Sequence, residues 1–507
     1  MSQDTLANNK RIAKNTMFLY FRMILIMGVT LYTSRVVLDK LGLSDYGLYN
    51  VVGSIVAIIS FINGTMSAGT SRFITFELGT KNSTKLSRTF STAFYTHAAL
   101  GVLIIILMET GGLWFFHNKL VIPPERMYAC FWVYQLSLFT AFISTTQIPY
   151  TAAIMAHERM SIYAYISIFE TFAKLGVCYL LSIASFDKLI VYATLIALIQ
   201  FVVAAFYRIY CIQNFSESRL QRIFDMSIFK SLLGFTGWNV MANLAETLKL
   251  QGVLILINLF FSPIIVAAQA VANQVTHAIM QFFNNFRVAI NPQIIKLYAS
   301  GDRDASKKLT LETTVYSFDL MLIIGFPAVV VMDWLMHLWL VEVPDYAVVF
   351  TQWIIIRQII GVFSSSFYTP MMAANKLKVN SVCAVFTGIG QFFLLYLLFR
   401  LGLGPMWIQY TGLIVTFFYS MGVKPFILHK DIDYSIKELL MCYWTCMKVC
   451  ILSCMIIIPA KLLLNDDTLG SLLKILISVM AVAISSILFM DKENRKRLFK
   501  IVSRKLS

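Results

Sequence analysis

Residues 14–35 read KNTMFLYFRMILIMGVTLYTSR, an apolar run long enough to cross a membrane that nevertheless holds Arg22. A hydrocarbon layer of about 30 Å is spanned by roughly 20 apolar residues in a helix. A cation near the centre of such a helix costs about 2.5–3.5 kcal/mol on insertion scales. The stretch therefore predicts a membrane helix that keeps one costly charge, and the rest of the chain indicates what that charge is for.

The composition of the whole chain is that of a membrane protein. Its 507 residues are 58% hydrophobic and only 13% charged, and the mean hydropathy is +0.73. A soluble protein of this size cannot bury so much apolar surface in ordinary cores. We therefore expect an all-α integral membrane protein with many spans.

The apolar runs, divided at Gly, Pro and charged residues, predict about fourteen transmembrane helices. The span at 231–258 is the least regular, because Glu246 and Lys249 interrupt it. The spans are expected near 14–36, 46–70, 89–113, 127–150, 160–183, 188–207, 231–258, 264–286, 310–332, 346–372, 379–399, 405–427, 438–460 and 469–490.

The distribution of basic residues predicts the orientation of these spans. With a cytoplasmic N-terminus and alternating loops, and with residues near span ends counted in the adjoining loop, 29 of the 42 Lys and Arg fall in cytoplasmic segments, 7 in outer loops and 6 well within spans. Basic residues in short loops favour the cytoplasmic side. We therefore expect both termini in the cytoplasm, and the net charge of +16 facing anionic phospholipids rather than nucleic acid.

A weak internal repeat predicts the domain organisation. Residues 71–94 and 291–318 share an apolar exit, a Gly, a polar stretch and a Thr-rich start to the next span. Parallel repeats of this kind are typical of transporters that bind substrate between two halves. We expect six-helix lobes at 1–210 and 211–430, two additional transmembrane helices at 431–490, and a basic cytoplasmic tail at 491–507.

Two acid–base pairs lie within the predicted spans. Glu170 precedes Lys174 by four residues, and Glu246 precedes Lys249 by three, so each pair shares a helix face. In one interpretation the pairs only lower the cost of insertion. In the other, the acids exchange a proton or bind a sodium ion while the lysines face a polar cavity.

Arginines within and beside the spans outnumber nearby acids. Arg22 and Arg357 have no acid within a helical turn, whereas Arg35, Arg72 and Arg287 lie at span ends. Each could reach the interface or a lipid phosphate. Together they favour a cavity that attracts anions, because the arginine fork stays charged and binds phosphate through two hydrogen bonds.

No metal or cofactor site is expected. Cys442, Cys446, Cys450 and Cys454 form one helical stripe, but the outer two lie about 18 Å apart at 1.5 Å rise per residue and cannot share a metal. The chain has no GxxxxGK[ST] phosphate loop and no HExxH or GxSxG motif, so we do not expect an enzyme.

Several stretches resemble one membrane-protein group. The opening run with its continuation SRVVLDKLGLSDYGLYNVVGS, and further KLVIPPERMYACFWVYQLS, FDKLIVYA, FTGWN, NPQIIKLYASGD and LWLVEVPDY, are similar to bacterial polysaccharide flippases. These belong to the multidrug/oligosaccharidyl-lipid/polysaccharide exporter superfamily. The resemblance runs from about residue 8 to beyond residue 430, and the last two helices match only in type.

The resemblance implies both a fold and a cargo. It implies two six-helix lobes around a cavity that opens alternately to each side of the bacterial inner membrane. The implied cargo is an undecaprenyl-diphosphate-linked oligosaccharide for O-antigen (lipopolysaccharide) or capsule assembly, in possible contact with polysaccharide polymerase machinery. Relatives carry cavity arginines on the first, second and eighth helices, where Arg22, Arg72 and Arg287 lie here.

The predicted site follows from these observations. The diphosphate-binding residues are expected to be Arg22, Arg72, Arg287, Arg357, Lys174 and Lys249, and the ion-coupling residues Glu170 and Glu246. One alternative is a cation-coupled multidrug exporter of the same superfamily, which should have a more acidic cavity. The other is a membrane polysaccharide polymerase or ligase, which should have a sizeable periplasmic loop.

Overall fold

The computed structural model describes the backbone of residues 3–59, 61–80, 82–157, 159–374, 376–491 and 495, and their side chains except at 3–23, 59, 61–65, 68, 160, 233–243, 288–289 and 292. The α-helices are α1 (Gln3–Ile59), α2 (Phe61–Gly79), α3 (Ser83–Leu107), α4 (Leu113–Asn118), α5 (Met127–Ala156), α6 (Met160–Ile183), α7 (Lys188–Asn214), α8 (Met226–Thr247), α9 (Val253–Phe260), α10 (Pro263–Ala299), α11 (Arg303–Val330), α12 (Met332–Trp339), α13 (Ala347–Ala373), α14 (Lys378–Arg400), α15 (Trp407–Phe418), α16 (Lys424–Ile432), α17 (Ile436–Leu463) and α18 (Thr468–Phe489).

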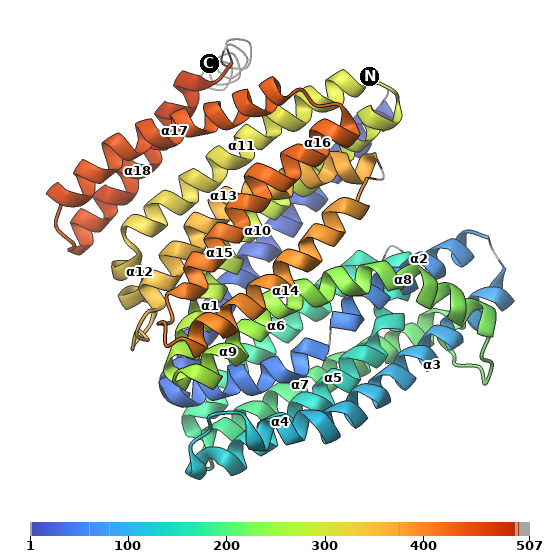
Figure 1. Ribbon diagram of the computed structural model, residues 1–507. Helices are drawn as coiled ribbons and strands as arrows, with labels where there is room; N and C mark the ends of the chain where they lie inside the picture. Colours follow the sequence, from blue (N-terminus) through green and yellow to red (C-terminus); the bar gives the residue numbers. More distant parts are fainter. Residues whose placement is uncertain are drawn as a thin grey trace. The chain divides into compact units, whose positions relative to one another are not determined.

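The predicted fold class is confirmed. Each of the fourteen predicted spans falls on one helix or on consecutive helical segments (Figure 1). Ten helical segments within the described residues are long and apolar enough to cross a membrane. The first two spans share α1, where Gly42 takes a φ of 78° that residues with a side chain rarely adopt, so the chain breaks there between them.

Three spans contain a π-helical turn, at Met108–Gly112, Leu248–Gly252 and Tyr419–Val423. In the third, the Lys424 N–H bonds to the Tyr419 carbonyl, five residues back. The next residue is a proline without an N–H, so the helix offers no donor to the Ser420 carbonyl. The hydroxyl of Tyr443 in α17 donates to that carbonyl at 2.7 Å. A neighbouring helix thus satisfies the group that the π turn leaves open.

The chain divides into two compact units. Unit 1 comprises Met1–Ala267 with Leu340–Pro344, and unit 2 comprises Ala268–Trp339 with Asp345–Ser507. These two units are defined by which parts of the backbone lie close together, whereas the predicted lobes at 1–210 and 211–430 are defined by an internal sequence repeat. The predicted lobe boundaries at residues 210 and 430 therefore stay a prediction.

The two stretches of the proposed repeat adopt the same local structure. In unit 1, α2 ends at Gly79 and α3 begins after Asn82, whose side chain accepts a hydrogen bond from the Lys85 N–H. In unit 2, α10 ends at Ala299 and α11 begins after Asp302, which caps the Ala305 N–H in the same way. In both stretches a helix ends, a short turn follows, and a side chain caps the N-terminus of the next helix.

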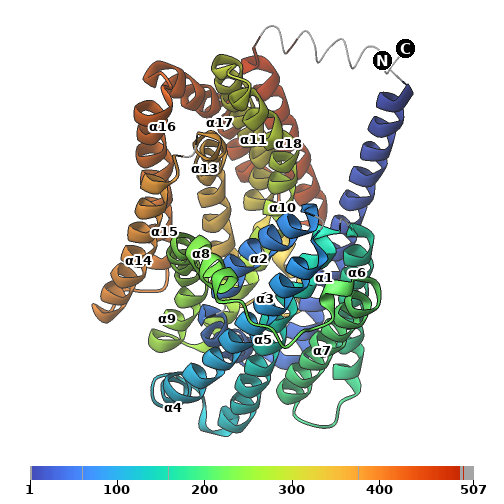
Figure 2. The same ribbon diagram turned by 90° about the vertical axis from the view of Figure 1, so that its right-hand side faces the viewer.

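In unit 1, α5 packs against α2, α3 and α7 (Figures 1 and 2). The core at one end of this group contains Ile74, Phe90, Tyr150, Ile154 and Tyr207, all almost fully buried. In unit 2, α11 packs against α13, α17 and α18, and these helices run beside one another in Figure 1. The arrangement places the last two helices directly on α11.

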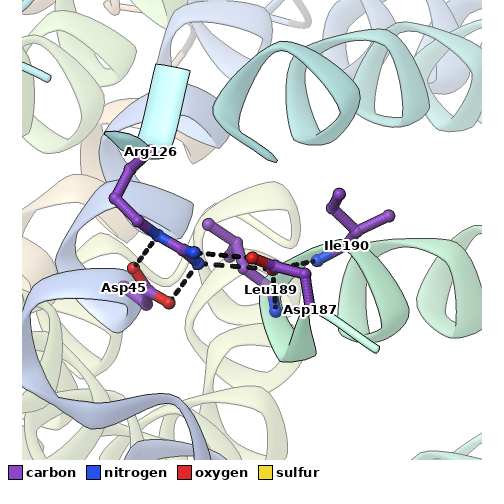
Figure 3. Close-up of polar contacts among 5 residues, drawn as sticks. All are labelled: Asp45, Arg126, Asp187, Leu189 and Ile190. Atoms are coloured by element: carbon purple, nitrogen blue, oxygen red, sulfur yellow. Dashed lines mark hydrogen bonds and ion pairs between the residues drawn. The ribbon is translucent and has the colours of Figure 1, made fainter. Parts of the chain in front are cut away.

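Loops that the topology places on one side of the membrane meet in the structure. The segments after the first, third and fifth spans come together in unit 1, where Arg126 binds both Asp45 and Asp187 (Figure 3). At loops of the opposite set, His157 Nε2 lies 2.5 Å from Glu217 Oε1. The alternation of loops is thus consistent within unit 1, while the assignment of one side to the cytoplasm stays a prediction.

Arg126 ties three separate segments together through both edges of its guanidinium. Its Nε donates to Asp45 Oδ1 at 2.8 Å, and its Nη2 also contacts Asp45 Oδ2. Its Nη1 donates to Asp187 Oδ2 at 2.5 Å. Asp187 Oδ1 accepts the Leu189 N–H at 3.0 Å and the Ile190 N–H at 3.3 Å, so the same carboxylate caps α7 (Figure 3).

The two carboxylates of this cluster differ in their surroundings. Burial raises the pKa of Asp45 and outweighs the charge and hydrogen bonds of Arg126. Burial alone would also raise the pKa of Asp187, but the hydrogen bonds from Arg126 and from the start of α7, with the charge of Arg126, together lower it. A carboxyl with a lowered pKa stabilises the folded state at neutral pH and loses that contribution as the pH falls through its folded-state pKa. Asp187 is therefore the carboxylate whose charge the fold favours.

We predict that Asp187→Asn destabilises the protein by about 1 kcal/mol, because it removes the ion pair and keeps an oxygen that caps α7. Asp45→Asn should cost less, since burial already disfavours its charge. The measurement is the midpoint of thermal unfolding in detergent. Asp225→Asn is the control, since Asp225 caps α8 in the same way and forms no ion pair in the part of the chain described. An equal loss in the Asp225 and Asp187 variants would contradict this account of the cluster.

Candidate functional site

The predicted site residues of unit 1 fall in four places, one of which is the Glu170–Lys174 ion pair on α6. Arg22 lies on the backbone of α1, but its side chain is outside the described residues. Arg72 is exposed on α2. Lys249 lies in the π-helical turn that follows α8, with its Nζ 3.8 Å from Oε2 of Glu246, whose side chain is 65% exposed. The two acid–base pairs expected from spacing are thus both formed, and the Glu246 pair lies largely in the open.

Glu170 and Lys174 line a pocket of unit 1. Lys174 Nζ lies 2.6 Å from Glu170 Oε1, and Gln200 Nε2 of α7 donates to the same oxygen at 2.9 Å. The pocket has a volume of about 410 Å³. Its polar wall is made mainly of hydroxyl groups from α1 and α6, with the pair at its side: Thr30, Thr33, Ser34, Ser167, Thr171, Tyr49 and Tyr192.

This pocket combines one carboxylate with many neutral oxygens. Carboxylate, hydroxyl and amide oxygens are the ligands that hard cations use in proteins. Lys174 already neutralises Glu170, so a cation or a proton would have to compete with the ammonium group for the carboxylate. The geometry therefore fits two interpretations. Glu170 can exchange a cation or a proton, or the Glu170–Lys174 pair can simply lower the cost of inserting α6 into the membrane.

Arg287 is the predicted arginine with the most unusual surroundings. It is 5% exposed, on α10 in unit 2. Its Nη2 donates to the Ser366 carbonyl at 3.1 Å and to Thr369 Oγ1 at 3.0 Å, and the Thr369 hydroxyl donates to Asn291 Oδ1 at 2.9 Å. Its Nη1 and the Ser366 hydroxyl have no hydrogen-bond partner among the residues that the structure describes. None of its partners in the described part of the chain is a carboxylate.

Arg357 packs within unit 2 against α15. A Cβ added to Gly412 would lie 2.4 Å from Arg357 Nη1. The glycine therefore makes room for the guanidinium between α13 and α15. Arg287 contacts α13 at Ser366 and Thr369, nine or more residues further along that helix, so the structure does not bring the two arginines to one place.

The predicted site residues do not include Lys424, although it lies within the predicted span 405–427. Lys424 is only 2% exposed in α16. Its Nζ lies 5.1 Å from the ring centroid of Tyr368 and 5.3 Å from that of Tyr419. The Tyr419 hydroxyl donates to the Asn380 carbonyl at 2.9 Å and to its side-chain oxygen at 2.8 Å. The sequence feature that could have identified Lys424 is its position within a predicted span, between an apolar run and Pro425.

The residues described contain no group of three or more His, Cys, Asp or Glu that could hold a metal ion. Cys442 and Cys446 of the predicted cysteine stripe are buried, and Cys450 and Cys454 are half-buried.

The fold resembles those of solved membrane transporters. Lipid II flippase MurJ in an inward closed conformation matches with a TM-score of 0.69 at 12% identity, over 93% of this chain and 98% of that chain. An inward-facing multidrug resistance MATE family transporter of the MOP superfamily matches with a TM-score of 0.64 at 14% identity, over 80% of this chain and 96% of that chain.

A third similar structure differs in the charge of its pocket. It is a MOP superfamily transporter from Pyrococcus furiosus whose binding pocket has reverse polarity, which suggests a different function for it, and it matches with a TM-score of 0.57 at 12% identity over 81% of this chain and 93% of that chain. No family model matches this sequence. No curated protein matches it either. At these identities the comparisons establish the fold: this chain has the fold of the MOP superfamily transporters.

Proposed function

We propose that this protein is a flippase that moves an undecaprenyl-diphosphate-linked oligosaccharide from the cytoplasmic to the periplasmic leaflet by alternating access. The products would be O-antigen or capsular polysaccharide. The observation that carries the proposal is Arg287, a buried guanidinium with a free N–H and no carboxylate partner among the residues described. The likeness to a lipid II flippase over 93% of the chain supports the same class of cargo.

The energetic argument starts from the cost of burying a charge. An unpaired charge in a low-dielectric interior is strongly unfavourable, and hydrogen bonds to a carbonyl and a hydroxyl offset only part of that cost. A phosphate group reaching Nη1 would supply the missing countercharge. Arginine suits this role because its planar fork can bind a phosphate through two N–H groups.

The other predicted residues differ in how much structural support they have for a role in transport. Arg22 and Arg72 remain proposed phosphate ligands on the resemblance alone. Arg357 and Lys249 remain proposed cavity residues, although Arg357 packs against Gly412 inside unit 2. Lys174 is bound to Glu170, so we propose that it sets the affinity of that carboxylate for a coupling proton or sodium ion.

The setting of the protein is part of the same proposal. We place it in the bacterial inner membrane with both termini in the cytoplasm, where its basic loops would face anionic phospholipids. Contact with the polysaccharide polymerase machinery would deliver the translocated cargo to the next reaction. No nucleic-acid partner is proposed.

The second function that an observation favours is cation-coupled export of a small molecule. The hydroxyl-lined pocket around Glu170 is the feature that favours it. The likeness to a multidrug transporter over 80% of this chain agrees with it as well. The two functions differ in cargo charge, since an exporter of cationic drugs would have no use for the Arg287 guanidinium, which has no carboxylate partner among the residues described.

We predict that Arg287→Gln lowers the initial rate of lipid flipping at least about tenfold, equivalent to roughly 1.4 kcal/mol of lost transition-state stabilisation. Arg287→Lys should retain part of the rate, because it keeps the charge and loses the fork. The assay uses proteoliposomes with a fluorescent undecaprenyl-diphosphate-linked oligosaccharide and a membrane-impermeant quencher. Arg303→Gln, at an exposed arginine of the same unit, is the matched control. A wild-type rate in the Arg287→Gln variant would refute the phosphate role.

We predict that Glu170→Gln reduces the part of transport that depends on an ion gradient and leaves gradient-independent flipping intact. The reason is that a neutral amide at this position has no negative charge to attract a cation and cannot exchange a proton. Glu246→Gln should have a smaller effect, because Glu246 is largely exposed. The measurement compares proteoliposomes with and without imposed proton or sodium gradients. Equal responses of both variants would remove the Glu170 pocket from the coupling proposal.

A further inference from the structure

A buried carboxyl group lies where α11, α17 and α18 meet in unit 2. Asp319 of α11 is 7% exposed, and its Oδ1 has no hydrogen-bond partner within the described part of the chain. The side chains close to it carry neutral groups: the Ser486 hydroxyl of α18 and the fully buried Cys446 thiol of α17. The Ser486 hydroxyl is close enough to interact with the Asp319 carboxyl group, and the Ser485 hydroxyl has no hydrogen-bond partner in the part of the chain described.

The basic groups on α17 and α18 are either exposed, as Lys437 and Lys461 are, or engaged elsewhere. On α17, Lys448 Nζ lies over the rings of Trp444 and Phe489, at 5.6 and 5.7 Å. On α18, Lys474 Nζ lies 2.5 Å from Asp466. Lys474 precedes Ser486 by twelve residues, which is about 18 Å along the helix.

The titratable groups on the remaining helices also bind other partners. On α13, Arg357 packs on Gly412, and Tyr368 lies over Lys424. On the short α12, His337 is exposed and lies 3.7 Å from Asp333. Asp319 therefore has no countercharge among the groups that these helices present, and its ionised form is costly there.

A pocket leads toward this carboxyl group from one end of the same three helices. It has a volume of about 370 Å³ and is lined by residues that include Val315, Cys442, Thr445 and Phe489. Asp319 follows Val315 by four residues on the same face of α11, and Cys446 follows Cys442 by four on α17. Ser485 and Ser486 precede Phe489 by one turn on α18. Asp319 and its neighbours Cys446, Ser485 and Ser486 thus lie one helical turn, about 6 Å along the helices, beyond the residues that line the inner end of the pocket.

The mouth of this pocket is acidic. Glu312, Glu438 and Asp491 line it. Lys308 Nζ lies 3.9 Å from Glu312 Oε1 and offsets one of these charges, and the Glu438 side chain accepts a hydrogen bond from the Ser435 N–H. These residues lie at the ends of spans that the charge distribution assigns to the cytoplasm. Acidic groups at a mouth concentrate cations, including protons, at its entrance.

We propose that Asp319 is a proton-binding site that exchanges its proton with the cytoplasm through this pocket. The proton reaches an oxygen of the carboxylate from water in the pocket and returns to water by the same route, so no other reactant is needed. The Ser486 and Ser485 hydroxyls can donate to the ionised form and accept from the protonated one. Use of this proton in the transport cycle rests on the proposed function, whereas the exchange itself does not.

The experiment is infrared difference spectroscopy of the full-length protein in liposomes, with the pH stepped from acid to alkaline. We expect a protonated-carboxyl band that disappears as the pH rises, is missing in Asp319→Asn, and is present at a shifted frequency in Asp319→Glu. Asp333→Asn, at an exposed carboxylate, should leave the band unchanged. A band that does not respond to pH, or an identical pH response in Asp319→Asn, would overturn the proposal.

A second measurement tests the route. Thr445→Trp fills the pocket, and should slow hydrogen–deuterium exchange of the Asp319 band several-fold. Leu440→Trp, on the exposed face of α17, should leave the exchange rate unchanged. Equal exchange rates in the two variants would refute entry through this pocket. Because neither measurement uses a transport substrate, a titrating band in a protein that moves no lipid would defeat only the flippase proposal.

Discussion

An ionised side chain in hydrocarbon must find a countercharge, reach the interface or carry a function, and this constraint organises the polar groups of this protein. Glu170 and Lys174 satisfy it by pairing within one helix. Lys474, 1% exposed, reaches the exposed Asp466 at a distance of 2.5 Å. Lys424 is enclosed by two tyrosine rings, which attract its ammonium group through their electron-rich faces.

Two groups satisfy the constraint only in part, and they carry the functional proposals. Arg287 has a carbonyl and a hydroxyl as acceptors, but its Nη1 has no acceptor in the described part of the chain. Asp319 has hydroxyl and thiol neighbours and no countercharge among the residues described. A protein that only needed stability would gain by replacing such groups with apolar ones. The two groups would bind different partners: Arg287 would bind an anion, and Asp319 would bind a proton.

The sequence predicted the features that depend on local spacing. Apolar length indicated the fourteen spans because a membrane fixes the length of a helix that crosses it. The spacing of four residues between Glu170 and Lys174 indicated their ion pair. Contacts between distant segments were beyond such reasoning: Arg126 binds Asp45, 81 residues away, and Asp187, 61 residues away. For the same reason the tyrosine rings around Lys424 and the helix junction at Asp319 emerged only from the packing.

The central claim is that the buried guanidinium of Arg287 binds the phosphate of a lipid-linked cargo. Native mass spectrometry of the protein extracted from its own membranes tests this most directly, since it identifies bound lipids by mass without an assay for transport. The account predicts that the wild-type protein retains a polyprenyl-diphosphate-linked glycan, and that Arg287→Gln loses most of it while keeping ordinary phospholipids. Equal retention by both proteins, or phospholipids alone on both, would contradict it.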